Sequence, residues 1–196
     1  MLSVFAAFAV TAGQAELAKA IGDTKMEVIQ TRNELQNTVD AIDALSKQKS
    51  GDMRPTYDTF VAQIGKTEAA AGLTRNRAEK MLKEGDEHFN SWQNDINSIS
   101  NQGLKKKAQK RLDVTQKSYK NVIANMQTSA PKFQSLLSDL NDIQKSLSND
   151  LTSGGVKSAR RSIGDAQWNL KFVRGAINDS VEQLGKMEKS LGTSAN

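Results

Sequence analysis

Apolar residues recur every seven positions through most of this chain. The cleanest row, in the last quarter, is Val156, Ile163, Leu170, Ile177, Leu184 and Leu191. A seven-residue repeat places such side chains on one face of a helix, which must pack against another helix to bury them. The repeat therefore predicts an all-α protein of long helices with coiled-coil geometry.

Three clusters of turn-forming residues divide the repeat into four segments. They lie at 50–52, 100–103 and 152–155, and they predict helices over about 15–49, 55–100, 104–151 and 156–191. Short turns make consecutive helices antiparallel, and the two central helices would be roughly 65–75 Å long at about 1.5 Å per residue. We predict an elongated antiparallel bundle of about four helices, with a long central hairpin whose two helices pack along most of their length.

Three features within these segments predict local detail. One row of the first helix contains the threonines Thr24, Thr31 and Thr38, which predict a weak seam. A row of the second helix contains the small residues Ala71, Ala78 and Gly85, which predict close approach of a neighbouring backbone. The repeat passes through Pro131 without a shift, which predicts a kink rather than a break.

The amino-terminal run Leu2–Ala12 is apolar and uncharged. It is too short to cross a bilayer as a helix, which needs about 20 residues, but it is typical of the apolar core of a secretory signal. Gly13 and Ala15 suit cleavage after residue 15. We predict a signal peptide at 1–15, a single elongated helical coiled-coil domain at 16–196, and export to the periplasm or cell envelope. The alternative is a buried helix start, because no basic residue precedes the run.

The residue types argue against an enzyme. The chain has no cysteine, which excludes thiol catalysis, disulfides, cysteine zinc sites and a lipid anchor on a cysteine of this sequence. His88 is its only histidine, and Glu84 one turn away would make only two metal ligands. We therefore predict no catalytic residue, no metal and no cofactor, and a structural or surface role for His88.

The net charge of +5 arises in the second half of the chain. An acidic half beside a basic half predicts that the halves face each other, or else that a partner binds. The densest basic group starts the third helix and comprises Lys105, Lys106, Lys107, Lys110 and Arg111. It predicts either contact with anionic lipid head groups or a solvated face paired with acids such as Asp95. Nucleic acid is disfavoured, because no aromatic residue is interleaved for stacking. Trp92 and Trp168 lie in or beside core rows, where bundle anchors are expected.

Three short segments resemble a known bacterial family. They are Val28–Arg32, Phe89–Gln93 and Leu147–Leu151, which are similar to the opening helix, the phenylalanine–tryptophan element and the leucine–asparagine corner of the domain of unknown function 2959. The resemblance implies an exported helical protein and implies no activity. Many such proteins look like lipoproteins with a cysteine after the signal, whereas this chain has Gln14 there.

These observations predict a non-enzymatic structural or interaction protein of the bacterial cell envelope. Its partner would be another protein or a second copy, bound through helix faces. The alternative is a peripheral membrane-surface protein that binds anionic lipid through the basic group at the hairpin tip.

Overall fold

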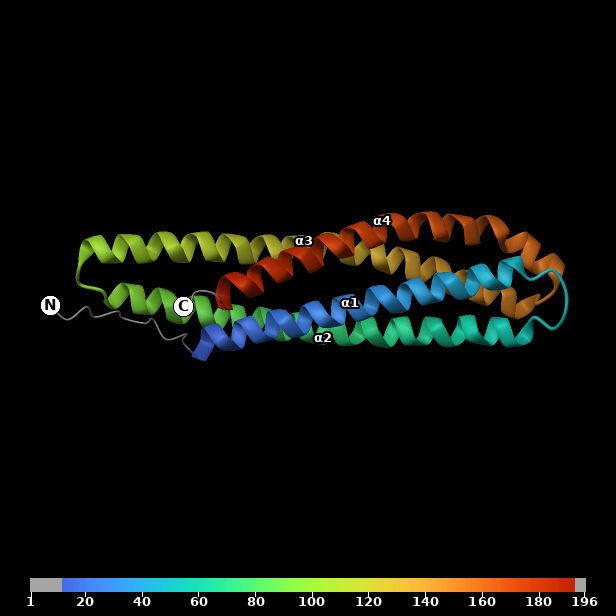
Figure 1. Cartoon of the computed structure of the whole chain (residues 1–196), viewed down its shortest axis with the longest axis horizontal. Helices are drawn as coiled ribbons and strands as arrows, with labels where there is room; N and C mark the ends of the chain where they lie inside the picture. Colours follow the sequence, from blue (N-terminus) through green and yellow to red (C-terminus); the bar gives the residue numbers. More distant parts are fainter. Residues whose placement is uncertain (1–11, 193–196) are drawn as a thin grey trace.

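Four long helices make up nearly all of residues 12–192, which are the residues that the computed structural model describes. They are α1 (Ala12–Lys47), α2 (Arg54–Ser98), α3 (Gln102–Asn149) and α4 (Ser153–Gly192). They lie side by side as a rod, and no strand occurs in that range (Figure 1). The prediction of an all-α antiparallel bundle is confirmed, with every helix boundary within three residues of the predicted one.

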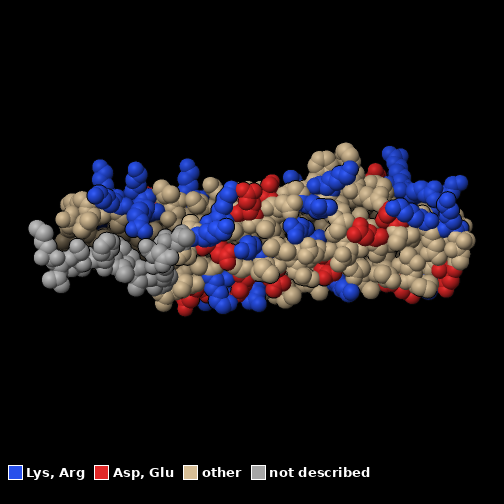
Figure 2. Space-filling view, viewed as in Figure 1, with Lys and Arg blue, Asp and Glu red and all other residues tan. Residues whose placement is uncertain are grey.

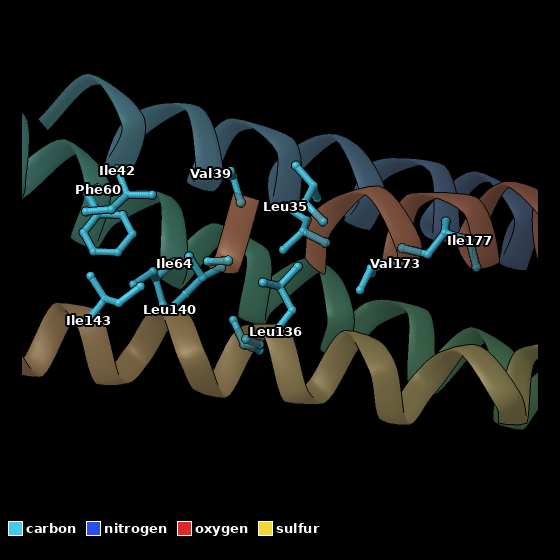
Figure 3. Close-up of a cluster of buried hydrophobic side chains, with 14 of the residues drawn as sticks. Leu35, Val39, Ile42, Phe60, Ile64, Leu136, Leu140, Ile143, Val173 and Ile177 are labelled. Carbon is cyan, nitrogen blue, oxygen red and sulfur yellow. The ribbon is translucent and has the colours of Figure 1, made fainter. Parts of the chain in front are cut away.

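The core of the rod is the set of heptad rows that the sequence shows. All residues of the α4 row from Val156 to Leu191 are buried. In the middle of the rod, side chains from all four helices meet, including Leu35 from α1, Phe60 from α2, Leu140 from α3 and Val173 from α4 (Figure 3). Each helix thus buries its stripe against its neighbours, which is the main source of stability in a bundle.

The central hairpin differs from the prediction. α2 and α3 run antiparallel and are joined at separated points, where Tyr57 Oη donates to the Gln144 carbonyl (3.2 Å) and Tyr119 Oη donates to the Met81 carbonyl (2.8 Å). Of the four neighbouring helix pairs, however, α2 and α3 share the least contact, and both α2 and α3 pack more extensively on other helices. The two helices thus lie together along the predicted hairpin but pack closely only at intervals, because much of each apolar seam faces α1 or α4 instead.

The small residues of α2 act in two ways. A Cβ at Gly85 would overlap the ring of Tyr119. This glycine therefore allows close approach as predicted, but of a large α3 side chain and not of a backbone. Around Ala71 and Ala78 the opposite occurs, because these short side chains do not reach α3 and a groove remains between the helices. Close approach is thus wrong for the two alanines.

The predicted weak seam of α1 is a row of hydrogen-bonded threonines. Thr24 and Thr38 are fully buried. Thr24 Oγ1 lies 2.8 Å from the Ala20 carbonyl oxygen of its own helix and 3.1 Å from the Arg77 carbonyl oxygen of α2. The Oγ1 atoms of Thr38 and Thr67 lie 2.8 Å apart. Because these hydroxyls have partners, their burial carries no unsatisfied polar group.

The helix ends follow local sequence signals. The α1–α2 turn contains Gly51 at φ 85°, a conformation that glycine adopts without strain. Asp52 Oδ1 accepts the Arg54 N–H (2.9 Å), and Pro55 lies in the first turn of α2. α3 continues through Pro131, as the unshifted repeat predicts.

The first described residues belong to the bundle. α1 begins at Ala12, Gly13 lies against His88, and Gln14 Nε2 donates to the Leu191 carbonyl (2.6 Å). The predicted signal peptide overlaps this start by four residues, and its remainder, 1–11, lies outside the described residues. None of the helices in 12–192 is both long and apolar enough to cross a membrane.

The two tryptophans occupy different environments. Trp92 is half-buried and packs against the core. Trp168 is 58% exposed, so its predicted role as a bundle anchor is wrong. The reason is its position on α4 between the buried rows, two residues from both Ala166 and Leu170.

Candidate anionic-surface interface

The α2–α3 hairpin projects beyond the other two helices. The start of α1 packs beside His88, and the end of α4 reaches Gln14. Of the four described helices, α2 and α3 continue beyond that level to the turn that joins them (Figure 1). The projecting part of α2 is roughly 15 Å long, at about 1.5 Å per residue. We call this projecting part, 89–118, the tip.

Contacts between α2 and α3 give the tip a defined structure. Ile96 and Leu112 are buried within it. The side-chain amides of Gln93 and Gln109 exchange two hydrogen bonds of 3.0 and 3.1 Å across the hairpin. Asn101 caps α3, because its Oδ1 accepts the Leu104 N–H (3.0 Å). These contacts fix the direction in which the start of α3 presents its side chains.

The five basic residues predicted as an anionic contact lie in the first three turns of α3. They are Lys105, Lys106, Lys107, Lys110 and Arg111. Lys105 Nζ donates to the Asn97 carbonyl (3.2 Å), and none of the five forms an ion pair with any residue of 12–192, Asp95 included. On the face shown in Figure 2, Lys and Arg side chains stand along the α3 edge at this end with no acidic side chain visible beside them.

The local sequence opposes these charges. The amino-terminal end of a helix carries a partial positive charge, and a cation there costs roughly 0.3–1 kcal/mol. The first turn of α3 contains no acidic residue, and three lysines follow it directly. Charge repulsion among the lysines adds to this cost. A feature that opposes local stability without compensation within the fold indicates a functional surface.

Two exposed apolar side chains lie among the basic ones. Leu104 is 59% exposed and Val114 is 60% exposed. Half-buried Trp92 is the nearest tryptophan, on α2. The tip therefore combines cations with aliphatic side chains and does not offer exposed aromatic rings for base stacking.

The acidic and basic halves face each other as predicted, since α1 packs on α4 and α2 packs on α3, but few ion pairs join them. Between residues that the structure describes, one ion pair joins the first half of the chain to the second, from Lys25 to Glu188. Its basic member comes from the first half, the reverse of the predicted polarity. The basic excess of α3 thus remains available to a partner.

His88 lies inside the bundle at the base of the tip. It is 6% exposed, and its ring contacts those of Phe89 and Trp92 (centroids 5.2 and 5.7 Å apart). Its Nε2 has no hydrogen-bond partner within residues 12–192. Burial lowers the pKa of His88. The surface alternative is therefore wrong and the structural role is confirmed. In the described part of the chain, no three His, Asp or Glu side chains are grouped to hold a metal ion.

The sequence analysis missed one exposed aromatic pair. Trp168 and Phe172 of α4 contact edge to face (5.5 Å), and Lys171 Nζ lies 4.9 Å from the centre of the Trp168 ring. A polar cleft of about 610 Å³ between α3 and α4 adjoins Trp168 and is lined by Asp139, Asp142 and Asp165 among others. The sequence does indicate that this pair is exposed, because residues 168 and 172 fall outside both buried rows of α4.

The fold and the tip define the chain as an elongated antiparallel four-helix bundle protein with a projecting basic hairpin. No curated protein and no solved structure matches it. A family profile matches residues 13–191, nearly the whole chain, and the protein belongs to that family, described as Protein of unknown function (DUF2959). The resemblance found in the sequence is confirmed.

Proposed function

We propose that this protein is a non-enzymatic interaction protein of the bacterial cell envelope, and that its tip binds the anionic head groups of a membrane surface. The observation that carries the proposal is the group of five basic residues at the start of α3, none of which forms an ion pair with a residue of 12–192. The first of them, Lys105, lies at the first turn, where the helix itself disfavours positive charge. Anionic phosphates in contact with this end would offset both that cost and the repulsion among the lysines.

The expected electrostatic free energy is large enough for membrane binding. Each basic residue near an anionic membrane surface contributes about 1 kcal/mol, so five contribute roughly 5 kcal/mol. Insertion of Leu104 and Val114 would add a smaller apolar contribution. The interaction is electrostatic and therefore weakens as salt rises.

The test is sedimentation with vesicles of phosphatidylcholine containing phosphatidylglycerol, at low and high salt. We expect binding at low salt, little binding to pure phosphatidylcholine, and loss of binding when all five tip residues are changed to Gln. The matched control removes five positive charges that lie away from the tip, by changing to Gln the exposed residues Lys145, Lys157, Arg160, Arg161 and Lys171. This control should retain binding, because its charges lie far from the tip.

Two outcomes would contradict the proposal. Equal loss in both five-residue variants would show attraction by net charge alone. Equal binding to neutral and anionic vesicles would show that the tip charges are not used. Either result would show that the tip charges do not direct the protein to anionic head groups.

A further inference from the structure

An apolar groove opens between α2 and α3 in the middle of the rod. Its volume is about 300 Å³, at the lower end of the range for ligand pockets. The walls come from α2 and α3, and buried side chains of α1 and α4, such as Val28 and Ile177, form the floor. The groove exists because Ala71 and Ala78 face the longer Met126 and Phe133 without reaching them.

Four hydroxyl groups that line the groove already have hydrogen-bond partners. The Oγ1 atoms of Thr31 and Thr74 lie 2.9 Å apart. Ser129 Oγ and Ser180 Oγ lie 3.1 Å apart, and each also lies 3.1 Å from the Ala176 carbonyl oxygen, an acceptor. These four hydroxyls have partners within the bundle, and the other polar side chains that line the groove are those of Arg75, Gln127 and Gln134. The groove therefore offers an occupant mainly apolar contact.

The length of the groove matches one acyl chain. The lining residues of α2 run from Ala71 to Leu82, which is about 16 Å at 1.5 Å per residue. The hydrocarbon core of a bilayer is about 30 Å thick, so a single leaflet gives its acyl chains about 15 Å.

One charged residue stands among those that line the groove. Arg75 is exposed, one turn from the Ala71 end, and has no ion pair among residues 12–192. An anionic group paired with Arg75 would leave most of the groove length to an attached chain. We infer that the groove binds a long-chain fatty acid, with the alkyl chain between α2 and α3 and the carboxylate at Arg75.

The test is fluorescence titration with dansylamino-undecanoate, followed by displacement with unlabelled myristate or with myristyl alcohol, which lacks the carboxylate. We expect one probe per chain. Ala78→Leu or Ala71→Leu should weaken binding at least about tenfold, the effect of excluding about two methylene groups from an apolar site. Ala69→Leu is the matched control, since Ala69 is exposed on the same helix outside the groove. Two alanine variants are used so that one remains if the other misfolds.

Arg75→Gln should weaken myristate about two- to fivefold, the effect of an exposed ion pair, and leave myristyl alcohol unchanged. Equal affinities in Ala78→Leu, Ala71→Leu and Ala69→Leu would overturn the site. So would a dimer in analytical ultracentrifugation that Ala78→Leu dissociates, because the occupant would then be a second copy. Neither result bears on the tip, whose vesicle test uses different residues.

Discussion

Thr38 of α1 and Thr67 of α2 form a hydrogen-bonded pair in the interior of the bundle, with their Oγ1 atoms 2.8 Å apart and neither side chain exposed. Thr38 Oγ1 also donates to the Glu34 carbonyl of its own helix (3.0 Å). Since the Thr38 proton is used there, Thr67 is the donor of the pair. The pair is therefore asymmetric, because only the Thr67 hydroxyl needs its partner as an acceptor.

This asymmetry predicts unequal costs for two similar substitutions. Thr38→Val leaves the Thr67 hydroxyl without its acceptor and should reduce the free energy of unfolding by about 1–3 kcal/mol. Thr67→Val leaves Thr38 bonded to Glu34 and should cost less than about 1 kcal/mol. The double variant should lie close to the native protein. Urea unfolding followed by circular dichroism measures all three, and additive effects of the two substitutions would contradict the inferred pairing.

Gly85 is predicted to be intolerant of a methyl group. Gly85→Ala gains up to about 1 kcal/mol of helix propensity, but its Cβ would displace the buried Tyr119 ring, whose hydroxyl donates to the Met81 carbonyl. Overpacking of this kind costs about 1–3 kcal/mol, so we expect a net loss of stability in thermal unfolding.

The control for that experiment is Gly65→Ala. Gly65 lies on the same helix and is exposed, and a methyl group added there would meet no atom within 4 Å beyond the backbone of its own helix. The substitution should raise stability by about 0.5–1 kcal/mol. A gain at both positions would show that Tyr119 moves aside without cost.

His88 is predicted to make stability depend on pH. Burial lowers its pKa below the ordinary 6.5, so the unfolded chain binds a proton more readily than the folded protein. The contribution of the neutral ring to stability is complete above pH 6.5 and is lost as the pH falls from 6.5 through the lower folded pKa. Urea midpoints across pH 4.5–8, at roughly half-unit steps, should show His88→Gln with a weaker pH dependence in that window. Parallel curves for the two proteins would contradict the assignment.

The predicted cleavage after Ala15 is measurable as a mass. Protein recovered from the producing cell should lack 1–15, and α1 would then begin with Glu16, whose negative charge is favourable at a helix start. Loss of the Gln14 contact to Leu191 should cost no more than about 1 kcal/mol. An intact mass that includes Met1 would contradict cleavage.

Much of the fold is present in the sequence. The rows of α4 and the turn at Gly51 predict helices, boundaries and antiparallel order, because the seven-residue period and local backbone preferences act within one helix or turn. The basic group at Lys105–Arg111 was also visible as a charge cluster beside a predicted turn. These are local properties, and residues next to each other in the chain determine them.

Only the tertiary structure decided which helices share their seams. The repeat predicts an apolar stripe on each helix, but it does not predict which neighbouring helix covers that stripe. For α2, the stripes of α1, α3 and α4 are of the same kind and could each serve. The packing of α1 against both α2 and α4 buried His88, placed Tyr119 over Gly85 and left Ala71 and Ala78 facing a groove. It also left the five basic residues of the tip without an ion pair to any residue of 12–192, because the distances between charges on different helices depend on how the helices are arranged in the bundle.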